Sequence, residues 1–187
     1  LIGDHGMATE QNQHYISDIT TGNATAGNNQ VVNIPDAYYQ GNILIENAKD
    51  ISFLNCIYMN SDKGIHFDLG VEAAKVQGCV FKDLGDSAVI IGNGHAAYKM
   101  GKERTTGVVI ENNVIRRIGK VNHSVPAICA FFSNTTTISH NDIYDVPYTG
   151  ISVGWGWYVV LNSDYSQKNV IEYNKIGKFM TTVRDGG

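Results

Sequence analysis

A short pattern of apolar and polar positions recurs five times along the chain. Each copy has an apolar residue, two variable residues, Asn or Cys, one further residue and a bulky apolar residue. Because side chains alternate between the two faces of a strand, each copy predicts two short strands that meet at a tight bend. Asn suits the bend because it tolerates a left-handed backbone and can hydrogen-bond an Asn in the next coil. The Asn or Cys stands at Cys56, Cys79, Asn113, Asn141 and Asn174, at intervals of 23, 34, 28 and 33 residues.

A third short apolar run follows each of the first four copies and starts with a small residue. These runs lie at 64–67, 88–91, 127–130 and 150–153, and residues 184–187 begin a fifth. Constant short strands at variable intervals are typical of a solenoid, in which each repeat is one coil and insertions fall in a loop. Three strands in a coil of about 22 residues predict a parallel β-helix, with strands of successive coils about 4.8 Å apart.

The same pattern divides the chain into two parts. Residues 1–40 are polar and irregular, so we expect an irregular loop or an incomplete first coil there. Residues 41–187 form the predicted β-helix domain of roughly six coils, with extra residues in loops at 92–106 and 154–168. A solenoid needs a cap over its last coil, and no capping sequence is visible before residue 187. We therefore expect a fragment truncated at its C-terminal end, whose partners include further coils of the same longer chain.

Composition favours an all-β protein and excludes several other classes. Ile and Val number 37 against 6 Leu, and 20 Gly and 18 Asn supply turn residues. The balance of 14 basic against 18 acidic residues does not indicate a nucleic-acid partner. No apolar run is long enough for a transmembrane helix, so no membrane partner is expected. The three cysteines lack metal-ligand spacing, and we expect neither a metal site nor a cofactor.

The five copies resemble the right-handed parallel β-helix repeat of polysaccharide-active enzymes. Residues 136–157, together with the terminal Asp185-Gly186-Gly187, more specifically resemble large bacterial β-helix glycoside hydrolases, in particular the family numbered 141 with fucosidase- and xylanase-type members. The resemblance implies a right-handed coil, in line with the general rule for parallel crossovers. It also implies a polysaccharide or oligosaccharide partner and a secreted, periplasmic or cell-surface location.

Two aspartates are the predicted catalytic residues. Asp145 lies on the turn before one small-residue strand, and we expect Asp185 on the equivalent turn one coil later. Carboxylates on adjacent coils would be on the order of 5 Å apart. Glycoside hydrolysis uses two carboxyl groups, about 5–5.5 Å apart for retention and about 6.5–9.5 Å for inversion. Neither the acid nor the stereochemical outcome follows from the spacing, and an aspartate in such a turn can instead cap backbone amides.

The candidate substrate groove is the outer face of the small-residue strands with the turns beside it. His66 is predicted to point outward from this face, because Ile65 and Phe67 point inward. Tryptophan rings suit the apolar face of a sugar, although they can also pack beneath the loop at 158–168. A lone histidine more often has a surface or structural role. The predicted substrate-binding residues are Trp155, Trp157, Tyr148, His66, His123 and Asp86.

The preferred interpretation is part of a glycoside hydrolase that acts on a complex polysaccharide, inactive as a fragment because later coils would complete its groove. A polysaccharide lyase remains an alternative, since Arg116, Arg117 and Arg184 lie on the lips of the groove. A lyase needs a base to remove the proton next to a uronate carboxyl, and often Ca²⁺. A non-catalytic carbohydrate-binding or structural β-helix is the third alternative, because fold alone does not imply function.

Overall fold

The computed structural model describes residues 43–92, 104–154 and 166–183, which contain fifteen short strands and no helix. The strands form three parallel sheets of five. The first sheet holds β1 (Ile43–Ile45), β4 (Ile65–Phe67), β7 (Val89–Ile91), β10 (Ile128–Phe131) and β13 (Ile151–Gly154). The second holds β2 (Ser52–Leu54), β5 (Lys75–Gln77), β8 (Val109–Glu111), β11 (Thr137–Ser139) and β14 (Val170–Glu172). The third holds β3 (Ile57–Met59), β6 (Val80–Lys82), β9 (Val114–Arg116), β12 (Asp142–Tyr144) and β15 (Lys175–Gly177).

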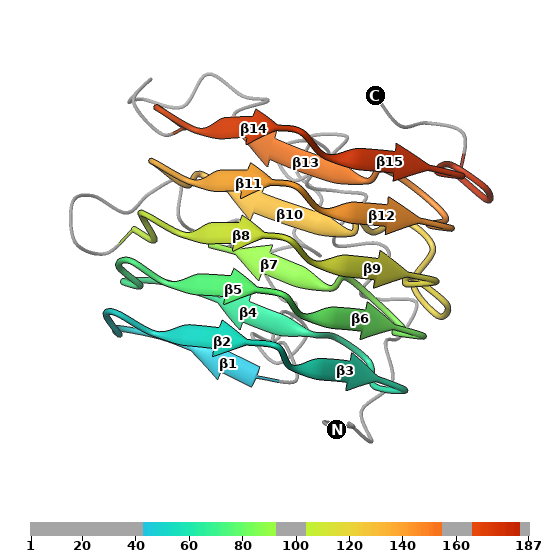
Figure 1. Cartoon of the computed structure of the whole chain (residues 1–187), viewed down its shortest axis with the longest axis horizontal. Coiled ribbons are helices and arrows are strands. Elements are labelled where there is room, and N and C mark those ends of the chain that lie inside the picture. The colour runs from blue at the N-terminus through green and yellow to red at the C-terminus, as the bar shows by residue number, and fades with distance from the viewer. Residues whose placement is uncertain (1–42, 93–103, 155–165, 184–187) are drawn as a thin grey trace, which may run out of the picture.

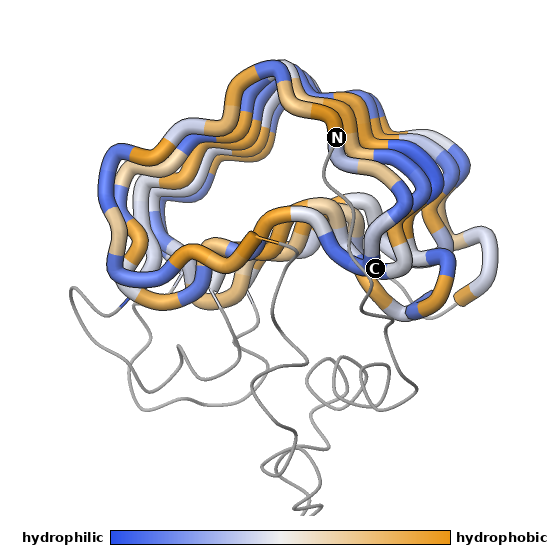
Figure 2. The backbone as a smooth tube through the Cα atoms, turned by 90° about the horizontal axis from the view of Figure 1, so that it is seen from below, coloured by the Kyte–Doolittle hydropathy of each residue, from blue (hydrophilic) through white to orange (hydrophobic). Residues whose placement is uncertain are grey.

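Neighbouring strands within each sheet are three elements apart in the chain, so every coil contributes one strand to each sheet. In Figure 1 the second and third sheets run one way across the front, and the first sheet returns behind them as the chain rises. This is a right-handed path. Figure 2 looks along the stack, where the described coils lie nearly over one another as a flattened ring. The predicted right-handed parallel β-helix is confirmed.

The repeat positions stack in register, which confirms the sequence pattern. In the second sheet, Val76, Ile110 and Ile138 follow one another in a single column. In the third sheet, Phe81 pairs with Tyr58 of the previous coil, and their rings stack with centroids 4.7 Å apart. All five side chains are fully buried. Each coil therefore buries its apolar residues against the coils above and below it, and this burial is the main stabilising contribution.

The Asn and Cys positions form a hydrogen-bonded ladder inside the stack. The backbone N–H of each ladder residue donates to the side chain of the next coil: Cys79 to Asn113 at 2.8 Å, Asn113 to Asn141 at 3.1 Å, and Asn141 to Asn174 at 3.0 Å. Cys56 donates in the same way to the sulfur of Cys79, at 3.4 Å.

One detail of the predicted bend is wrong. The left-handed backbone belongs to the residue before each ladder position, because the ladder side chain must turn inward to reach its neighbours. These preceding residues have φ between 52° and 66° and are Asn55, Gly78, Asn112, His140 and Tyr173.

The outer face of the first sheet differs from the exposed groove that we expected. Ile65 and Phe67 belong to the core cluster, as predicted, and His66 alternates with them on the opposite face. The neighbouring outward positions in register are Ile90 and Cys129. These three outward side chains are nevertheless buried, whereas Leu44 and Ser152, at the two ends of the same column, are half-buried.

Candidate functional site

Polar side chains gather where the third sheet turns into the first. We call this region the turn edge; it consists of residues 60–64, 83–88, 117–127, 145–150 and 178–183. Each turn directly precedes the next strand of the first sheet or follows a strand of the third. Because the coils are stacked, turns that are far apart in the chain present their side chains side by side.

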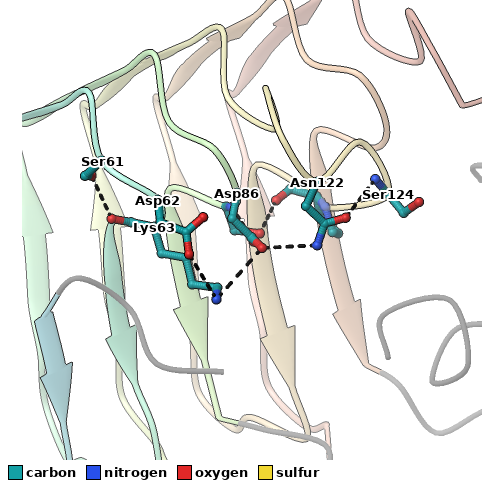
Figure 3. A network of polar contacts seen from close by, with 8 residues as sticks. Ser61, Asp62, Lys63, Asp86, Asn122 and Ser124 are labelled. Atoms are coloured by element: carbon teal, nitrogen blue, oxygen red, sulfur yellow. Dashed lines mark hydrogen bonds and ion pairs between the residues drawn. The ribbon is translucent and has the colours of Figure 1, made fainter. Parts of the chain in front are cut away.

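A buried cluster on the turn edge joins three successive coils (Figure 3). The ammonium of Lys63 lies 3.6 Å from a carboxylate oxygen of Asp62 and 4.0 Å from one of Asp86. The amide of Asn122 donates to the same oxygen of Asp86, at 3.1 Å. Lys63, Asp86 and Asn122 are all buried. Two carboxylates thus surround one ammonium in a site with little water, where electrostatic interactions are stronger than at the surface.

Backbone stacking explains why these groups meet. The N–H of Asp86 donates to the carbonyl of Asp62 at 2.7 Å, so the two aspartates occupy neighbouring coils. The other carboxylate oxygen of Asp86 accepts from the N–H of Ser87 at 2.6 Å. The Ser87 hydroxyl in turn donates to the carbonyl of Pro126 at 2.7 Å. Both oxygens of Asp86 therefore have partners inside the protein, so the structure gives it a turn-stabilising role in addition to the predicted substrate contact.

His66 lies beside this cluster with one nitrogen partnered. Its Nε2 is 2.8 Å from the carbonyl of Gly92, and a carbonyl only accepts, so Nε2 carries the hydrogen. The Nδ1 atom is buried and has no hydrogen-bond partner among the described residues. The pKa of His66 is lowered to about 4, mainly by burial and to a smaller extent by the Lys63 charge, although the Gly92 hydrogen bond, Glu46 and Asp86 oppose the shift. The ring is therefore neutral at pH 7.

A second polar column on the turn edge alternates in charge. The register stacks Asp83, Arg117, Asp145 and Lys178 in successive coils. Arg117 donates to both carboxylate oxygens of Asp83, at 2.8 and 2.9 Å. Lys178 lies 2.8 Å from Asp145, and this hydrogen bond raises the pKa of the lysine. All four residues have positive φ, so they occupy the same left-handed position of their turns. We call this column the charge ladder.

Asp83 is the best-connected carboxylate of the charge ladder, and its replacement tests the ladder. The hydrogen bond from Arg117, with help from Lys120, holds the pKa of Asp83 well below its usual range. We expect Asp83→Asn to lower the free energy of unfolding by about 1 kcal/mol in low salt and by less in about 1 M salt. Because the pKa is lowered on folding, this contribution is present above about pH 4 and is lost as the pH falls.

Urea unfolding at both salt concentrations measures the effect. The matched control is Glu72→Gln, which breaks the isolated and exposed ion pair with Lys49. It should change stability by no more than about 0.5 kcal/mol. Equal losses for the two variants, or a loss at Asp83 that does not respond to salt, would contradict the ladder interpretation.

The structure places only some of the predicted site residues. Asp145 lies in the charge ladder, and Tyr148 and His123 are half-buried on the turn edge. Lys178 stacks on Asp145 in the next coil, and the placement of Asp185 on the equivalent turn stays a prediction. Asp185, Trp155 and Trp157 lie outside the described residues.

Sequence reasoning missed the buried cluster around Asp86. Its members Asp62, Lys63 and Asn122 carry no motif of their own. The available signal was that Asp62-Lys63 and Asp86-Ser87 precede equivalent strands by the same number of residues.

The described residues hold neither a metal-binding cluster nor a membrane-spanning helix. No three or more His, Cys, Asp or Glu side chains in that part of the chain are placed to hold a metal ion. The same residues contain no helix that could cross a membrane.

Comparison with known proteins finds similarity at the level of fold. No family model matches the chain, and no curated protein matches it. A solved structure described as a glycoside hydrolase superposes with a TM-score of 0.58 at 24% sequence identity. The match covers 73% of this chain and 25% of the other, so the chain spans about a quarter of that protein's length. The chain is thus a right-handed parallel β-helix similar in fold to a glycoside hydrolase.

Proposed function

We propose that this chain is part of a carbohydrate-active enzyme, a glycoside hydrolase that cleaves a complex polysaccharide with two aspartate carboxylates. The observation that carries the proposal is the concentration of aspartates on one edge of a fold that a glycoside hydrolase shares. Carboxylates are the groups that glycoside hydrolysis requires. The described aspartates of the turn edge are Asp62, Asp83, Asp86 and Asp145.

The proposed catalytic pair is Asp145 and Asp185. Asp145 holds the ammonium of Lys178 at 2.8 Å, and a carboxylate in such a pair is an acceptor of protons and hydrogen bonds. It therefore suits the nucleophile or general base. Asp185 would then be the acid that protonates the leaving oxygen, because one of the two carboxyls must deliver a proton. Trp155, Trp157, Tyr148 and His123 remain proposed substrate contacts. The contacts predicted for His66 and Asp86, whose side chains are buried, stay predictions. Export from the cell is proposed as well.

The basic residues of the turn edge favour a hydrolase over a lyase. A lyase needs a base and a cationic group free to meet a uronate. Within the described part of the turn edge, every lysine and arginine has an aspartate within 4.0 Å. The four cations are Lys63, Arg117, Lys120 and Lys178.

Reducing-sugar release by the full-length protein on a panel of polysaccharides tests the proposal. Asp145→Asn and Asp185→Asn should each lower the rate by about 10³-fold, because each removes a group that transfers a proton or attacks the sugar. Asp83→Asn is the matched control, since it occupies the same ladder position without a proposed catalytic role. It should keep activity within about threefold. Thermal unfolding followed by circular dichroism checks that each variant is folded.

Asp62→Asn and Asp86→Asn distinguish a wrong assignment of the catalytic residues from a wrong assignment of the reaction. If Asp145→Asn and Asp185→Asn stay active while Asp62→Asn or Asp86→Asn does not, the catalytic pair is wrong and the hydrolase stands. If the unaltered full-length protein releases no sugar from any polysaccharide of the panel, the hydrolase proposal is overturned.

A further inference from the structure

Two neighbouring positions of the ladder hold cysteines, one above the other. Cys56 directly precedes β3 and Cys79 directly precedes β6, and these strands pair in register, so the two cysteines occupy the same place in neighbouring coils. Both coils lie at the bottom of the stack in Figure 1. Paired strands lie about 4.8 Å apart, and a disulfide needs Cα atoms about 4.4–6.8 Å apart. The stack therefore holds the two backbones at a separation that a disulfide can span.

The two side chains also meet within the ladder. The backbone N–H of Cys56 donates to the sulfur of Cys79 at 3.4 Å, and that sulfur lies 3.5 Å from the carbonyl oxygens of Phe53 and Gln77. The thiol of Cys56 donates to the carbonyl of Leu54 at 3.4 Å. Both sulfurs thus contact the same short stretch of backbone, residues 53–56.

The cysteine pair is the weakly bonded part of the ladder. Asn113 accepts from the backbone N–H of Cys79 and donates to the carbonyl of Val76 and to Asn141. A thiol is a weaker donor and acceptor than an amide. A covalent link at Cys56 and Cys79 would compensate for the weaker bonds, because a disulfide stabilises a fold by restricting the unfolded chain.

The two thiols differ in how well an oxidant can reach them. Cys56 is half-buried and Cys79 is buried. Burial raises the pKa of the Cys79 thiol and so disfavours its thiolate, which is the reactive form. Cys129 is also buried, and its neighbours in register, Ile90 and Ser152, are not cysteines. A small disulfide oxidant would therefore react first at Cys56, and Cys129 would stay reduced.

We propose that Cys56 and Cys79 are a disulfide-forming pair that links the coil of β2 and β3 to the coil of β5 and β6 when a small disulfide such as oxidised glutathione is present. The Cys56 thiolate attacks the oxidant, forms a mixed disulfide and releases one glutathione. The Cys79 thiolate then attacks the Cys56 sulfur and releases the second glutathione. The two cysteine thiols are oxidised to one disulfide, the oxidant is reduced to two glutathione thiols, and the two cysteine protons pass to these thiols.

Peptide mapping of the full-length protein tests the proposal. The protein is incubated with oxidised glutathione, unfolded in urea with N-ethylmaleimide to block free thiols, and digested with trypsin without reductant. Trypsin cleaves after lysine and arginine, so the two cysteines fall on separate peptides, residues 50–63 and 76–82. Mass spectrometry should find these peptides joined, with the blocking group on Cys129. Both peptides blocked, or glutathione on Cys56 without the link, overturns the proposal.

Single substitutions test the order of the two steps. Cys79→Ser should accumulate glutathione on Cys56, because the second thiol is missing. Cys56→Ser should take up glutathione on Cys79 at least about tenfold more slowly. Equal rates in the two variants overturn the assignment of Cys56 as the first thiol to react. Cys129→Ser is the matched control and should form the link at the rate of the unaltered protein, whose own peptide map decides the proposal even where a variant does not fold.

Discussion

Replacing Asn141 with alanine is expected to lower the free energy of unfolding by about 4 kcal/mol, because the change leaves several buried polar groups without partners. The Asn141 oxygen accepts from the backbone N–H of Asn113 at 3.1 Å and from its amide at 2.9 Å. The Asn141 amide donates to the carbonyl of Ile110 at 3.0 Å and to Asn174 at 2.9 Å. Asn141 and Asn113 are both buried, so water cannot replace the lost bonds.

Asn141→Cys is the matched variant for this prediction. Cys79 occupies the equivalent ladder position and accepts from a backbone N–H through its sulfur, so cysteine keeps a weak form of one bond. We expect a loss of about half that of Asn141→Ala. Equilibrium unfolding in urea measures both values. Equal losses for alanine and cysteine would show that the ladder bonds contribute little and that volume alone matters at this position.

A second large effect is expected at acidic pH through His66. Burial lowers its pKa to about 4 in the folded state, against about 6.5 in an unfolded chain. Between these values the unfolded chain binds a proton that the folded chain does not, so stability falls as the pH falls. The free energy of unfolding falls by about 3 kcal/mol in total between about pH 6.5 and pH 4 through this group. The charged groups around the ring are Lys63, Glu46 and Asp86, and the two acids oppose the shift without abolishing it.

Replacing His66 with glutamine isolates the contribution of the histidine to the pH dependence of stability. His66→Gln removes the titrating group and keeps an N–H donor that can reach the carbonyl of Gly92. Urea midpoints measured between about pH 7 and pH 4 should therefore fall less for His66→Gln than for the unaltered protein. His123→Gln, at a half-buried position of the turn edge, should leave the pH dependence as it is. Parallel pH profiles for His66→Gln and the unaltered protein would contradict the prediction.

The coil architecture could be predicted because the sequence pattern that marks each coil spans only a few residues. The apolar residues that flank each ladder position lie within six residues of one another, so the pattern marks each pair of strands without knowledge of any long-range contact. The stacking of Ile110 on Val76, and of Asn141 on Asn113, then follows from repeating the same unit. The left-handed residue was assigned one position too late, because the pattern does not reveal which residue of the bend turns inward.

The turn edge could not be predicted to the same extent. Its contacts join Lys63 to Asp86 and Asp86 to Asn122 across turns of different length. The turn at 117–127 is longer than its neighbours, so no fixed interval predicts that Asn122 reaches the carboxylate of Asp86. The partner of Asp145 could not be predicted for the same reason. The pairing register of β12 with β15 alone places Lys178 over Asp145.

The sequence by itself determined the fold class, the repeat positions and the inward columns. Only the tertiary structure decided that Lys63 sits between two carboxylates, that Asp145 belongs to a charge ladder and that His66 is buried and neutral. The physical reason is that strand alternation and coil repetition act over a few residues, whereas charge pairing and burial depend on which turns the stacked coils bring together.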